Sequence, residues 1–198
     1  MPKIVDVEAM QDRILSAAFS CFATRGYHAA RMSDVAQEAG LAKGTLYLYF
    51  ASKAALTQAL IAREFAMIEA LSQQGPPADL ASLMEQLRDT LLRGGENRQA
   101  IRMFFEVMGP GLEDGGLRQL IGGYFQRLGQ SYSAALTDLQ AQGAIRRDVE
   151  PEAAGRALAA MLDGMITHAA LFDIPEVAFA GQVEASLQVI EAGLMLRV

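Results

Sequence analysis

The sequence predicts an all-α protein, and three observations support that fold class. Apolar residues recur at intervals of three and four along most of the chain, as they do on one face of an α-helix. Alternating runs of β-branched residues, which would indicate strands, do not occur. Glycine, proline and short polar residues separate the apolar segments at helical lengths. With 198 residues, 52% of them hydrophobic, the chain can form a small N-terminal head and a larger helical body.

The head is expected to contain three helices. The first, 8–25, has an apolar face and ends at Gly26. The second, 33–39, ends at Gly40, a residue that accepts positive φ and lets the chain turn sharply. The inward residues of the first helix are expected to be Ile14, Ala17, Ala18, Cys21 and Phe22.

The third expected helix, 43–49, follows that turn directly. Its only aliphatic residues are Leu46 and Leu48, and the rest of its surface is polar or rich in hydroxyl groups. A helix, a tight turn and a second helix within twenty residues form the arrangement that places a recognition helix in the major groove of DNA. The sequence therefore predicts a helix-turn-helix head.

The body is expected to contain six further helices. Ser52 and Asp79 are good N-caps for the fourth and fifth helices, and Pro151 suits the first turn of the eighth. Gly94 and Gly95 are expected to end the fifth helix, and Gly109-Pro110 the sixth. The expected ranges are 53–73, 80–93, 96–108, 115–141, 151–172 and 176–198. We expect two domains, 1–52 for DNA binding and 53–198 for ligand binding and dimerisation.

The segment AGLAKGTLYLYFASKAAL resembles the DNA-binding signature of TetR-type transcriptional regulators. The resemblance begins near Arg13, in RILSAAFSCFATRGYHAA, and continues without a gap to about Ile61. A weaker similarity, at 143–164, is to the segment that leads into the family's dimerisation helices. The resemblance implies a helix-turn-helix head on a ligand-binding, dimeric helical body.

The resemblance also implies which residues contact DNA. Lys43 and Thr45 suit base edges, and tyrosine hydroxyls suit phosphate oxygens. Two positions depart from the usual pattern: Arg31 and Ala42 stand where capping serine or threonine residues are common, which affects the operator sequence more than the class of function. The predicted DNA-binding residues are Arg31, Lys43, Gly44, Thr45, Tyr47, Tyr49 and Lys53. Taken singly, each lysine could be a solvated surface charge and each tyrosine a half-buried aromatic.

Charge and composition agree with this class. The net charge is −6, but residues 1–63 carry seven basic and five acidic groups, a net of +2, which leaves −8 for the remainder. A mildly basic head on an acidic body suits a protein that touches phosphate at one end. The chain has no long apolar run and no secretory leader pattern, and its single cysteine, Cys21, suits a reducing cytoplasm. No cofactor, metal site, membrane association or catalytic constellation is expected.

The body is expected to bind a small hydrophobic or aromatic effector, because methionine and phenylalanine are frequent in its helices. The predicted ligand-binding residues are Met84, Phe104, Met108, Phe125, Met161, Met165 and His168. Ordinary core packing is the alternative for each of them, and a core or interface histidine the alternative for His168. Glu106 is expected to form a surface ion pair with Arg102, four residues earlier.

The last two expected helices each have two apolar faces, whereas a surface helix needs only one. The second faces are expected to meet a second copy of the chain. The predicted dimer residues are Ala157, Ala160, Gly164, Ala185, Val189, Ala192 and Leu196. The sequence thus predicts a homodimeric transcriptional regulator, a repressor released from a palindromic operator by a hydrophobic effector, with activation left open. The alternative is a helical adaptor or ligand-binding protein that does not bind DNA.

Overall fold

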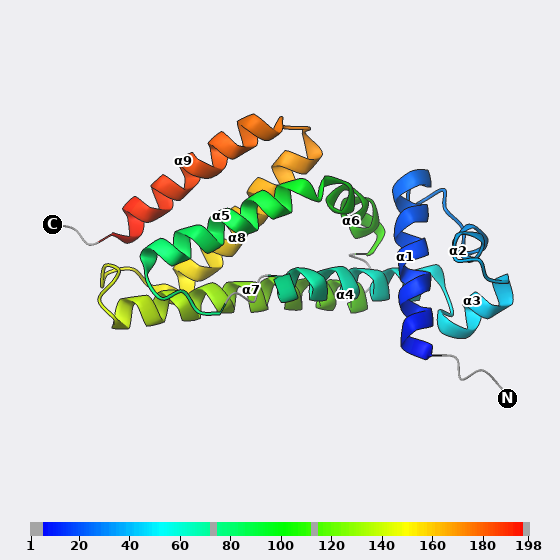
Figure 1. Cartoon of the computed structure of the whole chain (residues 1–198). Coiled ribbons are helices and arrows are strands. Elements are labelled where there is room, and N and C mark those ends of the chain that lie inside the picture. Colours follow the sequence, from blue (N-terminus) through cyan, green and yellow to red (C-terminus); the bar gives the residue numbers. More distant parts are fainter. Residues whose placement is uncertain (1–5, 72–74, 112–114, 196–198) are drawn as a thin grey trace. The chain divides into compact units, whose positions relative to one another are not determined.

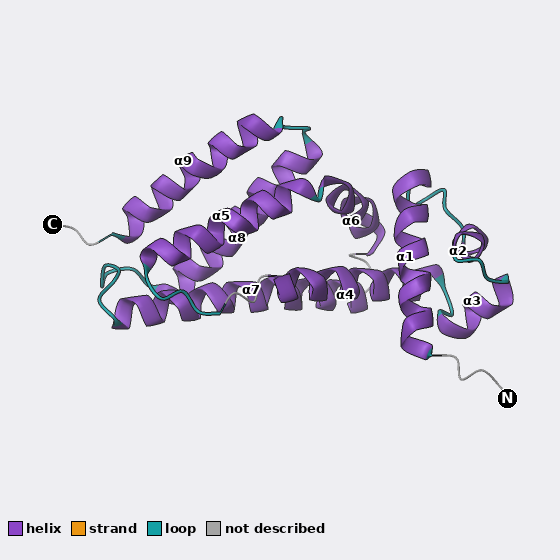
Figure 2. Cartoon of the chain, in the orientation of Figure 1, coloured by secondary structure: helices purple, strands orange, loops and turns teal. Residues whose placement is uncertain are grey.

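A computed structural model describes residues 6–71, 75–111 and 115–195. Within these residues the fold is all-α, as predicted, with nine helices and no strand (Figures 1 and 2). The helices are α1 (Val7–Arg25), α2 (Met32–Glu38), α3 (Lys43–Tyr49), α4 (Lys53–Leu71), α5 (Leu80–Glu96), α6 (Arg98–Gly111), α7 (Gly115–Ala141), α8 (Pro151–Leu171) and α9 (Glu176–Leu194).

The chain forms two compact units, and their boundaries differ from the predicted division at residue 52. The first unit comprises residues 1–68 and 102–118, and the second comprises 69–101 and 119–198. The difference arises because Leu56 and Leu60 of α4 and Met103 of α6 are buried in the core of the head. Most of α4 and the later part of α6 therefore fold with the helix-turn-helix.

The core of the first unit is built on α1, which lies against α2. The five residues of α1 that the sequence predicts to face inward are all buried, and Val35 of α2 and Leu46 of α3 complete the centre of this core. Cys21 is 3% exposed, and burial raises the pKa of its thiol. Cys21 is a packing residue, as expected from its position in the α1 stripe.

In the second unit α5 lies along both α8 and α9 (Figure 1). Gly94 and Gly95 do not end α5, contrary to the prediction, because they serve helix packing. A Cβ on Gly94 would lie 2.4 Å from Ile166 Cδ1, and a Cβ on Gly95 would lie 2.3 Å from Phe179 Cε1. Glycine at these positions lets α8 and α9 approach α5 closely, and α5 continues to Glu96.

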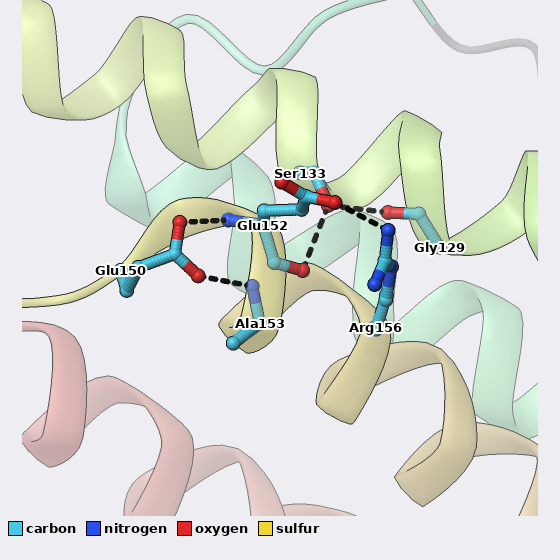
Figure 3. A network of polar contacts seen from close by, with 6 residues as sticks. All are labelled: Gly129, Ser133, Glu150, Glu152, Ala153 and Arg156. Carbon is cyan, nitrogen blue, oxygen red and sulfur yellow. Dashed lines mark hydrogen bonds and ion pairs between the residues drawn. The ribbon is translucent and has the colours of Figure 1, made fainter.

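A polar network joins α7 to the start of α8 (Figure 3). The Ser133 hydroxyl donates to the Gly129 carbonyl at 2.8 Å or to the Glu152 carbonyl at 3.2 Å. The Glu150 carboxylate caps α8 by accepting from the N–H groups of Glu152 and Ala153. The helices approach closely here, since a Cβ on Gly155 would lie 2.3 Å from the backbone nitrogen of Ser133.

The predicted helix starts are confirmed at three caps. Ser52 Oγ accepts from Ala55 N–H at 3.1 Å, Asp79 Oδ1 accepts from Ser82 N–H at 2.8 Å, and Pro151 occupies the first turn of α8. The predicted ends are less accurate. Helix α6 continues past the predicted stop to Gly111, and α9 ends at Leu194 rather than at the chain end.

In the described part of the chain, no helix is long and apolar enough to cross a membrane.

Candidate nucleic-acid interface

The turn between α2 and α3 fixes the direction of α3. Gly40 has a φ of 63°, its N–H donates to the Gln37 carbonyl at 3.0 Å, and Leu41 N–H donates to the Ala36 carbonyl at 2.8 Å. This pair of bonds is the Schellman arrangement that ends a helix at a left-handed residue. A Cβ on Gly40 would also lie 2.8 Å from Arg13 Nη2. The predicted turn is therefore present, and its positive φ favours glycine at this position, whereas the guanidinium end of Arg13 is flexible enough to move away from a Cβ.

The start of α2 is capped without a side-chain bond from its N-cap residue, Arg31. Asp34, three residues later, accepts from Arg31 N–H at 2.8 Å. The Asp34 carboxylate also lies 3.7 Å from the guanidinium of Arg25. Because Asp34 provides the capping interaction, the exposed Arg31 side chain has no capping task.

Helix α3 buries one residue and exposes most of the others. Leu46 is fully buried, whereas Tyr47 is 42% exposed and Leu48 is 84% exposed. Lys43 and Gly44 are also exposed, and Thr45 is half-buried. Tyr49 is half-buried and packs against the core of the first unit. Leu46 and, in part, Tyr49 thus anchor α3 in the core, and the remaining surface is polar apart from the exposed Leu48.

Two of the exposed residues are neighbours on one side of α3. The Lys43 ammonium lies 5.9 Å from the centre of the Tyr47 ring, within cation–π range. A Cβ placed on Gly44 would meet no atom of the chain within 4 Å. The start of α3 therefore presents a positive charge and an aromatic hydroxyl beside a position with no side chain. Sequence reasoning missed Leu48, which it grouped with the buried Leu46. The two leucines are two residues apart, a step that turns the side chain by about 200° around the helix, so they were expected to lie on opposite sides.

Lys53 lies in a different environment from the other predicted DNA contacts. Its ammonium donates to the backbone carbonyls of Tyr27 and Ala30, the latter at 2.7 Å. It also lies 4.2 Å from the centre of the Tyr27 ring and 5.6 Å from that of Phe22. Burial lowers the pKa of Lys53. These contacts hold the ammonium against the α1–α2 loop.

The predicted ligand-binding residues divide between the two units. In the second unit, Met84 is buried and Met165 half-buried at its core, and Phe125 packs on Tyr124 with ring centres 5.3 Å apart. In the first unit, the Phe104 ring lies 5.7 Å from that of Phe65. The side chain of Met108 lies outside the described residues.

Met161 and His168 lie on the exposed side of α8. Residues that line an interior cavity would be buried. The His168 ring packs on the Phe172 ring, with centres 4.8 Å apart.

The two predicted faces of α9 are distinct in the structure. Phe179, Val183, Leu187, Ile190 and Leu194 are buried against the chain, whereas Ala185, Val189 and Ala192 are exposed. Val189 is 69% exposed. The predicted residues of α8, namely Ala157, Ala160 and Gly164, are exposed as well. Leu196 lies outside the described residues.

Comparison with known proteins gives matches over most of the chain. A family model described as "Bacterial regulatory proteins, tetR family" matches residues 14–60. A second, described as "BetI-type transcriptional repressor, C-terminal", matches residues 76–194. The first match contains every residue predicted to contact DNA.

Individual relatives agree with these models. The HTH-type transcriptional regulator UidR of Escherichia coli strain K12 is 23% identical over 184 residues, covering 92% of this chain and 93% of the relative. The Fatty acid metabolism regulator protein of Bacillus subtilis strain 168 is 27% identical over 160 residues, covering 78% and 80%. A TetR transcription regulator from Haloarcula marismortui ATCC 43049 shares the fold, with a TM-score of 0.85 at 17% identity over 96% of this chain and 100% of that chain.

All three of these proteins are named as regulators, two of them of transcription. The second family model covers more than half of the chain, and the first covers the helix-turn-helix. The chain therefore belongs to the TetR family of bacterial transcriptional regulators and has a BetI-type C-terminal region.

Proposed function

We propose that this chain is a homodimeric repressor that binds a palindromic DNA operator through α3. The observation that supports this most strongly is the composition of the exposed face of α3. Lys43, Tyr47 and Leu48 are exposed on a helix that the Gly40 turn and the buried Leu46 hold in place. Packing alone does not require α3 to expose a leucine beside a lysine and a tyrosine.

Each residue of this face has a role that follows from its chemistry. Lys43 donates to guanine O6 or N7 or to a phosphate, and Tyr47 donates to a phosphate. Gly44 allows the backbone to approach the DNA. Thr45 and Leu48, three residues apart on one side of the helix, supply apolar contacts to thymine methyl groups.

Three further predicted contacts lie outside this exposed face. Arg31, at the start of α2, reaches a phosphate or the minor groove. Tyr49 is half-buried, so at most its hydroxyl group contacts the DNA. We assign Lys53 to holding the head together, because its ammonium already has two carbonyl partners.

We further propose that α8 and α9 pair with the same helices of a second chain. Their exposed residues form stripes of small and aliphatic side chains, in which Gly164 leaves room for close approach. Two helices from each chain would form a four-helix bundle with two-fold symmetry. Two-fold symmetry suits a helix-turn-helix protein, since paired heads then meet successive major grooves of a palindromic site.

The proposed effector is a small hydrophobic or aromatic molecule bound in the body. The supply of apolar side chains there supports it, and so does the similarity to a protein named for regulating fatty acid metabolism. An effector that binds better to the DNA-incompetent form weakens operator binding by the same factor. As a regulator of bacterial genes the protein would act in the cytoplasm. A thermal-shift screen tests this part, because a ligand that binds only the folded state raises the melting temperature.

Selection of bound fragments from the source genome tests DNA binding. We expect an enriched palindrome, and we expect Lys43→Ala and Tyr47→Phe each to weaken binding to it by roughly 1–3 kcal/mol. Arg147→Ala is the matched control, since it removes an exposed positive charge from the second unit. Fluorescence anisotropy with a labelled operator measures the affinities. Parental affinity in both α3 variants would show that another surface binds the operator.

A helical adaptor that binds only protein is the competing function. It predicts no enriched fragment and no mobility shift with any DNA. Operator binding by the proposed route should instead decrease steeply with salt concentration, because bound phosphates release counterions.

A further inference from the structure

The loop from Gly26 to Arg31, between α1 and α2, is held by groups that come from far along the chain. Tyr27 N–H donates to Glu106 Oε2 at 2.7 Å, a bond that joins residues 79 positions apart. Glu106 lies on α6, in the part of that helix that belongs to the first unit. Its observed partner is therefore the backbone of the α1–α2 loop, where the sequence suggested a surface ion pair with Arg102.

Gly26 lies beside this carboxylate. It has a φ of 77°, and a Cβ built on it would lie 3.6 Å from Glu106 Oε2, an ordinary van der Waals distance. The positive φ, and not a shortage of space, therefore favours glycine here, and the carboxylate accepts the next N–H along the chain. A hydrogen bond from an N–H to an ionised carboxylate is stronger than one between neutral groups.

Lys53 holds the same residue by its other backbone group. Its ammonium donates to the Tyr27 carbonyl and lies over the Tyr27 ring. The Tyr27 ring in turn packs edge-on against Phe22, with centres 5.3 Å apart. All three groups of Tyr27 are thus held. Glu106 of α6 binds its N–H, Lys53 of α4 binds its carbonyl, and Phe22 packs against its ring.

This loop sets the position of the DNA-reading helices. It leads directly into α2 at Met32, and α2 carries α3 through the Gly40 turn. Helix α6 is anchored beside the loop a second time, because Met103, one turn before Glu106, is 6% exposed in the core of the first unit. The start of α6, Arg98–Ile101, belongs to the second unit.

We propose that Glu106 is a positioning residue for operator binding: its bond to Tyr27 holds the α1–α2 loop, and so the orientation of α2 and α3, in the DNA-competent form. This inference rests on the proposed DNA-binding function and adds that operator affinity depends on α6. A shift of α6 that withdraws the carboxylate frees the Tyr27 N–H and loosens the loop while leaving α3 itself intact.

The test compares Glu106→Ala with Glu106→Gln in the full-length protein. Both variants remove the same negative charge, which by itself should favour binding to phosphate. Only the glutamine variant keeps an acceptor oxygen for Tyr27 N–H. We expect Glu106→Ala to weaken binding to the selected operator about tenfold, the equivalent of about 1.4 kcal/mol, and Glu106→Gln to stay within about threefold of the parent. Glu85→Ala, an exposed carboxylate of α5, is the control.

Hydrogen exchange at the Tyr27 amide provides the second measurement. It should accelerate about tenfold or more in Glu106→Ala and little in Glu106→Gln, while exchange within α8 and α9 stays unchanged. The proposal is overturned if exchange at Tyr27 is the same in all variants, or if it accelerates without loss of operator affinity. Equal losses in both variants also contradict it, since charge and not the bond would then matter. A parent protein that binds no genomic fragment would instead contradict the proposed function itself.

Discussion

Leu48 is a large apolar side chain that the packing of α3 does not require. It is 84% exposed, while its neighbour two positions earlier, Leu46, is fully buried. An aliphatic side chain in water gains nothing from exposure, but against DNA it can cover the C5-methyl group of a thymine. The sequence identified the helix and its polar residues. It did not single out Leu48 as exposed, because a leucine on a short helix is ordinarily a core residue.

Thymine-to-deoxyuridine substitution in the operator tests this role directly, because it removes one methyl group at a time. We expect one position at which deoxyuridine weakens binding of the parent by roughly 1 kcal/mol, the order of a buried methyl or methylene group. Leu48→Ala should bind the normal operator more weakly and be insensitive to deoxyuridine at that position. Thr45→Ser, which keeps the hydroxyl and loses a methyl, is the control for the neighbouring residue. Equal sensitivity in parent and Leu48→Ala at every position would contradict the contact.

Tyr124 predicts a pH dependence of stability. Burial, with smaller contributions from neighbouring acidic groups and Tyr132, raises the pKa of Tyr124 to about 12. The folded state then keeps the phenol proton at pH values where the unfolded chain, with a pKa of about 10, has lost it. This contribution to stability is complete below pH 10 and is lost as pH rises through about 12. In denaturant unfolding between pH 9 and 11, Tyr124→Phe should lose less stability than the parent, by roughly 1 kcal/mol; parallel curves would contradict this.

At the scale of elements, helix starts were more predictable than helix ends: α1, α3 and α7 end where the sequence predicts, whereas α5, α6 and α9 do not. The starts depend on local bonds, such as those of Ser52 and Asp79, which sequence neighbours supply. Gly95, expected to end α5, instead faces the ring of Phe179, a residue more than eighty positions away that leaves no room for a Cβ there. The same glycine can end a helix or admit a neighbouring helix, and the local sequence does not distinguish the two uses.

Gly155 provides a test of such close packing. Any Cβ there would lie 2.3 Å from a backbone nitrogen of α7, and backbone cannot rotate away as a side chain can. We expect Gly155→Ala to lower the free energy of unfolding by about 1–3 kcal/mol, the range for overpacking. Gly122→Ala, at an exposed position of α7 where a Cβ meets nothing within 4 Å, should raise it by about 0.5–1 kcal/mol. Urea unfolding measures both, and a stabilised Gly155→Ala variant would contradict the observed approach of α7 and α8.

At the scale of the whole molecule, the sequence predicted the fold class and the family, because both follow from helical periodicity and one long motif. It did not predict the two units, since helices α4 and α6 each contribute residues to both of them. The division of the candidate ligand residues between units has the same origin: periodicity shows which residues are apolar but not which helices they pack against. The helix-turn-helix that carries the candidate DNA interface was predictable because it lies within one continuous segment.

The proposed dimer yields the last prediction. Val189→Glu should convert the protein to a monomer at micromolar concentration, because it places a charge in an apolar stripe. Gly164→Leu should act similarly. Gly164 is exposed and a Cβ there meets nothing within 4 Å in its own chain, so we expect the added side chain to disturb the contact with the partner. Gln130→Glu, on the exposed side of α7, is the control. Sedimentation velocity measures the outcome, and a monomeric parent would overturn the arrangement.

The burial of Cys21 makes this protein unusually convenient for spectroscopic labelling. It is the only cysteine in the chain, and it is both shielded from reagents and held in the less reactive thiol form by its raised pKa. A second cysteine introduced at an exposed position of the head outside the α1–α2 loop, such as Asp12, would therefore react selectively without removal of the native one. A pair of such labels in an assembled protein would report the separation of the two heads in solution, with and without DNA, from a single substitution.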